Sequence, residues 1–458
     1  MFHRLGISPN NDPRTALRGR LQRNRRGHKL VAVDIETEDL ELLARFVSKL
    51  GGYAEGLFDY YDFRFPKTVL RGHIDSVRAD LLQLRQPIHE AAVSLRPPTI
   101  GKDVVWEEAE QNWNYGQTLR SAGGITMISQ NYRDRMTPEN LRRAMTAKVL
   151  HHCQAGLLDD LIDTGRYSFI EAKDLYHHCL TSLIDPGFEI NAFRKELALS
   201  LNQEQLSVFD LMTNITAAFN QLYQASPHGN DLFYEMERIN DRHVLGQALT
   251  MFQKHPNIDL PKLKRVAMGL SAMDSDLRWT ERLSPYLSGV PYYNLIDMSF
   301  LDELPSRQEI DAMLHTWFYY DLVITMLNHI VGVHKDLRSG IVNLALLSVR
   351  ESEVLNLTSP QGYNPSLTVR DYEDLFARTA EFSNRALRIA VAELEDEKLF
   401  YPFITIMIPV VLMADWIGNR DDMIHQYLAT IAPSVREAAE AHAVAESRVS
   451  VSEVQTSR

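Results

Sequence analysis

Three carboxylates lie within five residues of one another in LLDDLIDTG (157–165), directly behind an apolar run: Asp159, Asp160 and Asp163. On a helix, Asp159 and Asp163 share a face, and in a last turn the helix dipole and their mutual repulsion both disfavour ionised acids. A bound divalent cation such as Mg²⁺, which prefers oxygen ligands, removes both penalties. The alternative is a solvated acidic helix end, so the motif needs a partner elsewhere in the chain.

A second polar group lies in MLNHIVGVHKDLRSGIVN (326–343). Asn328, Gly332 and Asp336 are four residues apart in turn, so they line one face of a predicted helix, with Lys335 beside the last acid. An amide oxygen and a carboxylate two turns apart can share one metal ion. The glycine between them leaves room for a water ligand, which Mg²⁺ often keeps.

Together the two groups resemble the two metal motifs of class I terpene synthases, over about residues 145–430. NHIVGVHKD is similar to the second motif, Asn-Asp-x-x-Ser/Thr-x-x-x-Glu, in which microbial members often place Lys just before the last acid. The family tends to continue with a glycine and an Asn-Leu pair, which match Gly340 and Asn343-Leu344. DDLID (159–163) resembles the first motif.

The resemblance also implies residues that contact diphosphate. Arg282 lies 46 positions before Asn328, where the family carries a diphosphate-sensing arginine ahead of a helix break, here SGVPYYNLID. Lys335 and Tyr427 are the other expected contacts, the latter in WIGNRDDMIHQY (416–427) at the family's Arg-Tyr pair.

The function that the resemblance implies is a Mg²⁺-dependent terpene cyclase, a carbon–oxygen lyase acting on phosphates. It would ionise a linear isoprenyl diphosphate of C15 or C20 length with three Mg²⁺ ions, cyclise the cation and lose diphosphate. Catalysis would depend on Asp159, Asp163, Asn328 and Asp336, which with Asp160 form the expected metal ligands. A homodimer also fits, because the family often pairs helical subunits.

Several positions depart from the family pattern and keep other interpretations open. His329, Gly332, Asp336 and Gln426 replace an acid, a hydroxyl, a Glu and an Arg. One alternative is a prenyltransferase or acyclic synthase of the same superfamily, although a chain-elongating enzyme should show two Asp-rich motifs. Another is a helical binding protein with a decayed site.

An allyl cation would also need an apolar pocket, in which aromatic faces stabilise positive charge. The candidate aromatics are Trp317, Phe318, Tyr320, Tyr286, Phe403 and Trp416. For each of them, ordinary core packing is the competing interpretation.

Composition bounds the class of protein. The 458 residues are 45% apolar and 24% charged, with a net charge of -12, which is typical of a globular chain and argues against nucleic-acid binding. Two cysteines, Cys153 and Cys179, form no disulfide framework and fit a reducing compartment, so a cytoplasmic location is expected. The paired HHC triplets (151–153, 177–179) fit no zinc template.

Helical periodicity predicts the elements that must position these residues, and alternating strand patterns are scarce. We expect an all-α, class I terpenoid synthase-like bundle enclosing one active-site cavity. Its helices are predicted at residues 37–50, 72–95, 138–164, 168–184, 203–225, 307–338 and 368–398. Helix starts at Thr137-Pro138, Ser306 and Thr368, and a stop at Gly165, follow from capping residues.

The expected domain order is a basic arm (1–35), a helical extension (36–110), the synthase-like domain (111–435) and a polar tail (436–458). A transit peptide is the alternative for the arm, which is poor in Ser and has no clear apolar face. The apolar run 399–418 contains two prolines and is short for a membrane span, which predicts a buried, kinked helix and no stable membrane insertion.

Overall fold

The computed structural model describes residues 128–129, 132–164, 167–185, 187, 195, 203–270, 275–358, 360, 363 and 367–393. The predicted arm, the helical extension, the run 399–418, the helix stop at Gly165 and the polar tail lie outside these residues. Within helices, the side chains of Asp160, Asp163 and Lys335 are also outside the described set.

The described residues are mainly helical and contain no β-strand, only an isolated bridge between Lys254 and Ile341. This confirms the all-α prediction for that part of the chain. The helices are α7 (Pro138–Thr164), α8 (Phe169–Ile184), α10 (Gln203–Gln224), α11 (Phe233–Leu249), α12 (Leu260–Gly269), α13 (Trp279–Leu283), α14 (Val290–Ser299), α15 (Arg307–Arg338), α16 (Leu344–Val349), α17 (Glu351–Val354) and α18 (Val369–Glu393), with 3₁₀ turns η3 (Arg133–Arg135), η4 (Thr250–Gln253) and η5 (Ser284–Tyr286).

The two helices that carry the acidic motifs begin where their capping residues predict. The hydroxyl of Thr137 accepts a hydrogen bond from the backbone N–H of Asn140 (3.2 Å), and that of Ser306 accepts one from Glu309 (3.1 Å). Each bond satisfies a donor that the first helical turn leaves without an intrahelical partner. The predicted bounds of α7 and α15 therefore agree with the structure.

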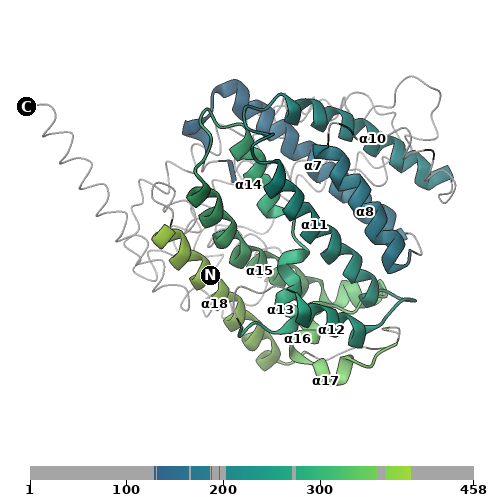
Figure 1. Cartoon of the computed structure of the whole chain (residues 1–458). Helices are drawn as coiled ribbons and strands as arrows, with labels where there is room; N and C mark the ends of the chain where they lie inside the picture. The colour runs from purple at the N-terminus through teal and green to yellow at the C-terminus, as the bar shows by residue number, and fades with distance from the viewer. Residues whose placement is uncertain are drawn as a thin grey trace, which may run out of the picture.

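Helix α11 was missing from the prediction because its buried face is partly polar. Glu235, Asn240 and His243 are all buried in it, which interrupts the apolar 3/4 spacing. The helix nevertheless lies at the centre of the bundle, in contact with α8, α14 and η5 (Figure 1).

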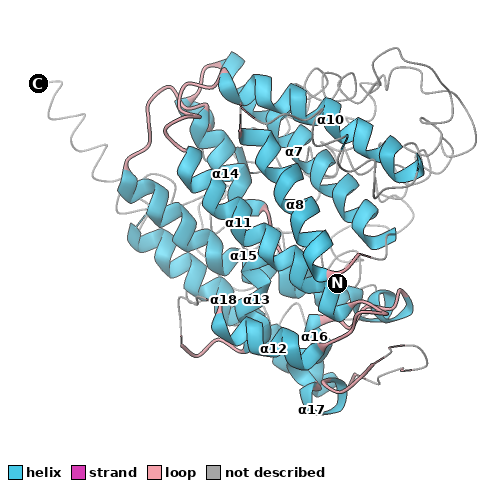
Figure 2. Ribbon diagram, turned by 45° about the vertical axis from the view of Figure 1, so that its right-hand side comes forward, coloured by secondary structure: helices cyan, strands magenta, loops and turns pink. Residues whose placement is uncertain are grey.

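The helices form a bundle in which α14 contacts α7, α11 and α15. On one side α10 packs on α7 and α8, and on the other α18 runs along α15, as both views show (Figures 1 and 2). No helix among the described residues is both long and apolar enough to cross a membrane.

A buried ion pair joins α7 to α14. The ammonium group of Lys148 lies 2.6 Å from a carboxylate oxygen of Asp297, both side chains have 0% exposure, and Ser129 hydrogen-bonds to both of them. Removing one partner of such a pair leaves a buried charge without compensation.

We therefore expect Lys148→Met to lower the free energy of unfolding by about 3–5 kcal/mol. The matched control is Arg143→Met, which removes one partner of the solvent-accessible ion pair with Glu139 on the same helix and should cost less than about 1 kcal/mol. Urea denaturation measures both. Equal effects of the two substitutions would mean that the buried pair contributes no more than a surface pair.

Candidate active site

The helices that carry the two motifs, α7 and α15, start side by side. Arg135, just before α7, forms an ion pair with Glu309 in the first turn of α15. The carboxylate of Asp302, before α15, accepts hydrogen bonds from the backbone of Thr137 (3.2 Å) and from the amide of Asn140 (3.4 Å). These contacts hold the first turns of both helices at one end of the bundle.

One short segment, residues 253–257, joins the chain beyond the far ends of the same two helices. The side chain of Asn257 donates to the carbonyl of Tyr167, which follows α7 (2.8 Å). The backbone N–H of His255 donates to the carbonyl of Gly340, which follows α15 (2.9 Å). The helices therefore run in the same direction and end at the same end of the bundle.

The two motifs also lie at the same level along these helices. Asp159 is the 22nd residue of α7, and Asn328 is the 22nd residue of α15. At 1.5 Å per residue, each is about 32 Å from the start of its helix. The structure thus brings the first acid of one motif and the amide of the other to one level, although they are 169 positions apart in sequence.

Asp159 is half-buried and held by a neighbouring helix. The hydroxyl of Tyr176, on α8, donates to Oδ1 of Asp159 (2.6 Å). Tyr293, on α14, is close enough for the carboxylate to contribute, after burial and Cys153, to raising the pKa of its hydroxyl. The hydroxyl of Tyr293 also lies 2.7 Å from Nδ1 of His152.

On α15, Asn328 is exposed and Asp336 is half-buried. The Asp336 carboxylate folds back over Gly332, where a Cβ would lie only 3.1 Å from Oδ2 of Asp336. The space above Gly332 that we assigned to a water ligand is therefore taken up by the acid itself.

Of the three predicted diphosphate contacts, the structure describes the side chain of Arg282 alone. Arg282, at the end of α13, donates to the backbone carbonyls of Leu277 (3.2 Å), Met268 (3.3 Å) and Ser275 (3.3 Å). Its guanidinium group thus holds the connection between α12 and α13. The Lys335 side chain and all of Tyr427 lie outside the described residues.

The described residues hold no group of three or more His, Cys, Asp or Glu side chains placed to bind a metal ion. Two of the three acids on α7 are outside that set, so the group at Asp159 is represented by one member. The donors that are described at this end, the carboxylates of Asp159 and Asp336 and the amide of Asn328, are of the oxygen type that Mg²⁺ prefers.

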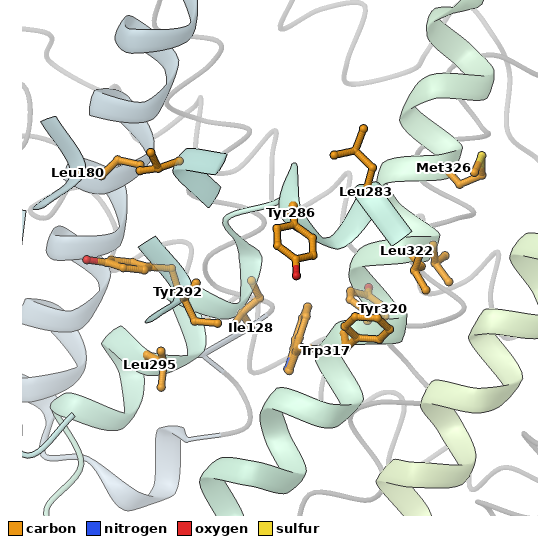
Figure 3. Packing of buried hydrophobic residues seen from close by; sticks show 14 of the residues in the cluster. Ile128, Leu180, Leu283, Tyr286, Tyr292, Leu295, Trp317, Tyr320, Leu322 and Met326 are labelled. Carbon is orange, nitrogen blue, oxygen red and sulfur yellow. The ribbon is translucent and has the colours of Figure 1, made fainter. Parts of the chain in front are cut away.

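Deeper in the bundle, aromatic side chains gather around the break between η5 and α14. Tyr286 and Trp317 point toward one another, with Tyr320 beside them (Figure 3). Trp317 and Tyr320 are in edge-to-face contact at 4.5 Å between ring centroids. Three of the predicted aromatics are therefore neighbours; Phe403 and Trp416 lie outside the described residues.

A half-buried cation and a buried acid accompany these rings, and the sequence analysis missed both. The guanidinium carbon of Arg242 lies 4.9 Å from the ring centre of Tyr286 and 5.9 Å from that of Phe318. On α15, Asp321 accepts a hydrogen bond from the hydroxyl of Ser288 (2.8 Å). Arg242 lies over the faces of Tyr286 and Phe318, an arrangement in which an aromatic ring stabilises positive charge.

Three histidines are neutral at physiological pH: His151 and His243, which are buried, and His329, which is half-buried. Burial lowers the pKa of His151 to about 3 and those of His243 and His329 to about 4. For His151 the neighbouring His243 contributes further, while a hydrogen bond to the Ser288 backbone opposes the shift at His243. His329 is therefore uncharged, so it neither repels a cation nor offers one the negative charge that a carboxylate would.

No protein-family model matches this chain, and no curated protein matches it either.

The buried acid gives a pH prediction. Burial raises the pKa of Asp321 to about 8, against the opposing effects of Ser288 and Arg242. An acid whose folded pKa lies above its unfolded value of 3.8 gives its full stability below that value and loses it as pH rises towards 8.

Asp321→Asn, which keeps the acceptor for Ser288, should remove this dependence. The stability of the variant relative to the unsubstituted protein should rise with pH between about 5 and 8, by up to about 1.4 kcal/mol per pH unit. Urea denaturation at both ends of this range tests it, and parallel curves would show that Asp321 is ionised in the folded protein.

Proposed function

We propose that this chain is a Mg²⁺-dependent terpene cyclase of the class I type, with the ends of α7 and α15 as its metal-binding rims. The observation that carries the proposal is the common direction and level of Asp159 and Asn328, held by contacts at both ends of their helices. The substrate would be a linear isoprenyl diphosphate, C15 or C20 in length.

The residues divide into two functions along the bundle axis. Asp159, Asp160 and Asp163 on one side, and Asn328 and Asp336 on the other, would hold Mg²⁺. When bound, Mg²⁺ supplies positive charge that makes diphosphate a better leaving group. Cleavage of the carbon–oxygen bond sends the electron pair to diphosphate and leaves an allyl cation.

The interior offers that cation aromatic faces. Tyr286, Trp317 and Tyr320 lie below the motifs, at η5 and along α15. Trp317 precedes Asn328 by 11 residues, or about 16 Å along the helix. Burial of this cluster keeps water away from the cation until cyclisation is complete.

Arg282, the expected diphosphate-sensing residue, has other partners in the fold. Arg282 can reach diphosphate only by giving up its three carbonyl partners. This observation favours one alternative, a helical binding protein with a decayed site, over an acyclic synthase or a prenyltransferase.

A product assay separates these functions. The full chain is incubated with C10, C15, C20 and C25 isoprenyl diphosphates, with Mg²⁺ or with EDTA, and the organic extract is analysed by GC-MS. A cyclic hydrocarbon or alcohol formed only with Mg²⁺ is expected. No product and no released diphosphate with any substrate would favour the decayed site.

Asp159→Asn and Asn328→Ala should each lower this activity by about 10²-fold or more, because each removes a metal ligand. Their helical circular dichroism should match that of the unsubstituted chain. The control is Asn220→Ala, which removes a side chain that bonds the carbonyl of Leu183 away from the site. Near-normal turnover of both site variants would rule out the metal assignment.

A further inference from the structure

A tight turn after α15 returns the chain onto the helix it has just left. Gly340 has a φ of 82°, in the left-handed region that glycine adopts without strain, and the N–H of Ile341 donates to the carbonyl of Asp336 (2.8 Å). The N–H of Val342 then bonds the carbonyl of Gln253 (2.9 Å). Asn343 is thereby fixed against the last turns of α15.

The side chain of Asn343 is fully buried and makes three hydrogen bonds. Its Oδ1 accepts from the N–H of Ala345 (2.8 Å) and so caps α16. Its Nδ2 donates to Oδ2 of Asp336 (2.6 Å) and to the carbonyl of His329 (3.0 Å). One amide thus joins the start of α16 to two residues within a nine-residue stretch of α15 that contains the second motif.

We propose that Asn343 is a positioning residue, which orients the Asp336 carboxylate for a divalent cation; this inference rests on the function proposed above. A carboxylate has several lone-pair positions, so a hydrogen bond to Oδ2 is compatible with metal coordination by the same group. Ligating carboxylates are characteristically hydrogen-bonded in this way, and the partner fixes their direction.

The type of residue at position 343 supports this function. A Lys or Arg there would neutralise the acid that the cation needs, and an Asp would repel it. An amide donates a hydrogen bond and carries no charge, so it fixes the carboxylate without neutralising it.

The first motif has the same arrangement. Asp159 receives its hydrogen bond from the hydroxyl of Tyr176, which is also uncharged and comes from the next helix. Each motif therefore has an acid oriented by a neutral donor from the element that follows it in the chain.

Asn343→Ser separates positioning from helix capping. Serine is a good N-cap residue and can still accept from the N–H of Ala345, but its hydroxyl is too short to take over the bond to Asp336. The matched control is Thr368→Ala, which removes a cap from α18, a helix that carries none of the proposed ligands.

The experiment measures Mn²⁺ binding to the full chain by electron paramagnetic resonance of the free ion, with thermal unfolding in parallel. Asn343→Ser should weaken Mn²⁺ binding about 10–100-fold, as loss of a hydrogen-bonding partner does at other metal ligands. Its unfolding temperature should fall by only a few degrees, because serine keeps the cap while the His329 carbonyl loses this donor. Thr368→Ala should bind Mn²⁺ normally.

Asp336→Asn distinguishes failure of the metal site from failure of the positioning function of Asn343. Weakened Mn²⁺ binding in Asp336→Asn but unchanged binding in Asn343→Ser would overturn the function of Asn343 and leave the metal site in place. Unchanged binding in Asp336→Asn would overturn the metal site, and the positioning proposal with it. Equal losses of Mn²⁺ affinity in Asn343→Ser and Thr368→Ala would mean that Asn343 acts as a helix cap and does not position Asp336.

Discussion

The parallel alignment of α7 and α15 is the constraint on which the proposed site depends. Contacts of Arg135 and Asp302 hold the starts of the two helices together, and residues 253–257 join the chain beyond their ends. Two long helices fixed at both ends cannot slide along each other without breaking one set of contacts. The level of Asp159 relative to Asn328 is therefore determined by contacts far from either residue.

Helix α14 lies between the two aligned helices and provides partners for polar side chains that they bury. It lies against both long helices, and Lys148 and Asp297 join it to α7 through a fully buried ion pair. Its start at the break after η5 leaves the hydroxyl of Ser288 to bond Asp321 and places Tyr286 among the rings of α15. Lys148 and Asp297 thus compensate each other and Asp321 has a hydrogen-bond partner, as the low polarity of a helical core requires.

The sequence predicted what depends on local signals. Capping residues Thr137 and Ser306 located the starts of α7 and α15, and periodicity gave their lengths. Helix α11 was missed because it buries two polar residues, His243 and Asn240. Their burial results from tertiary packing, which hydrophobic periodicity in the sequence does not detect. The carbonyl partners of Arg282 likewise come from residues 5 to 14 positions away, in a connection whose path only the fold determines.

Gly332 and Asp336 differ from the motif that this segment resembles, and in the sequence these differences left a decayed site as one alternative. In the structure the two residues pack against each other. The Asp336 carboxylate occupies the space that a side chain at 332 would need, since a Cβ there would lie 3.1 Å from Oδ2. A Cβ at 332 would require this carboxylate to shift by a few tenths of an ångström. The glycine at 332, the carboxylate of Asp336 and the buried amide of Asn343 thus pack as one group.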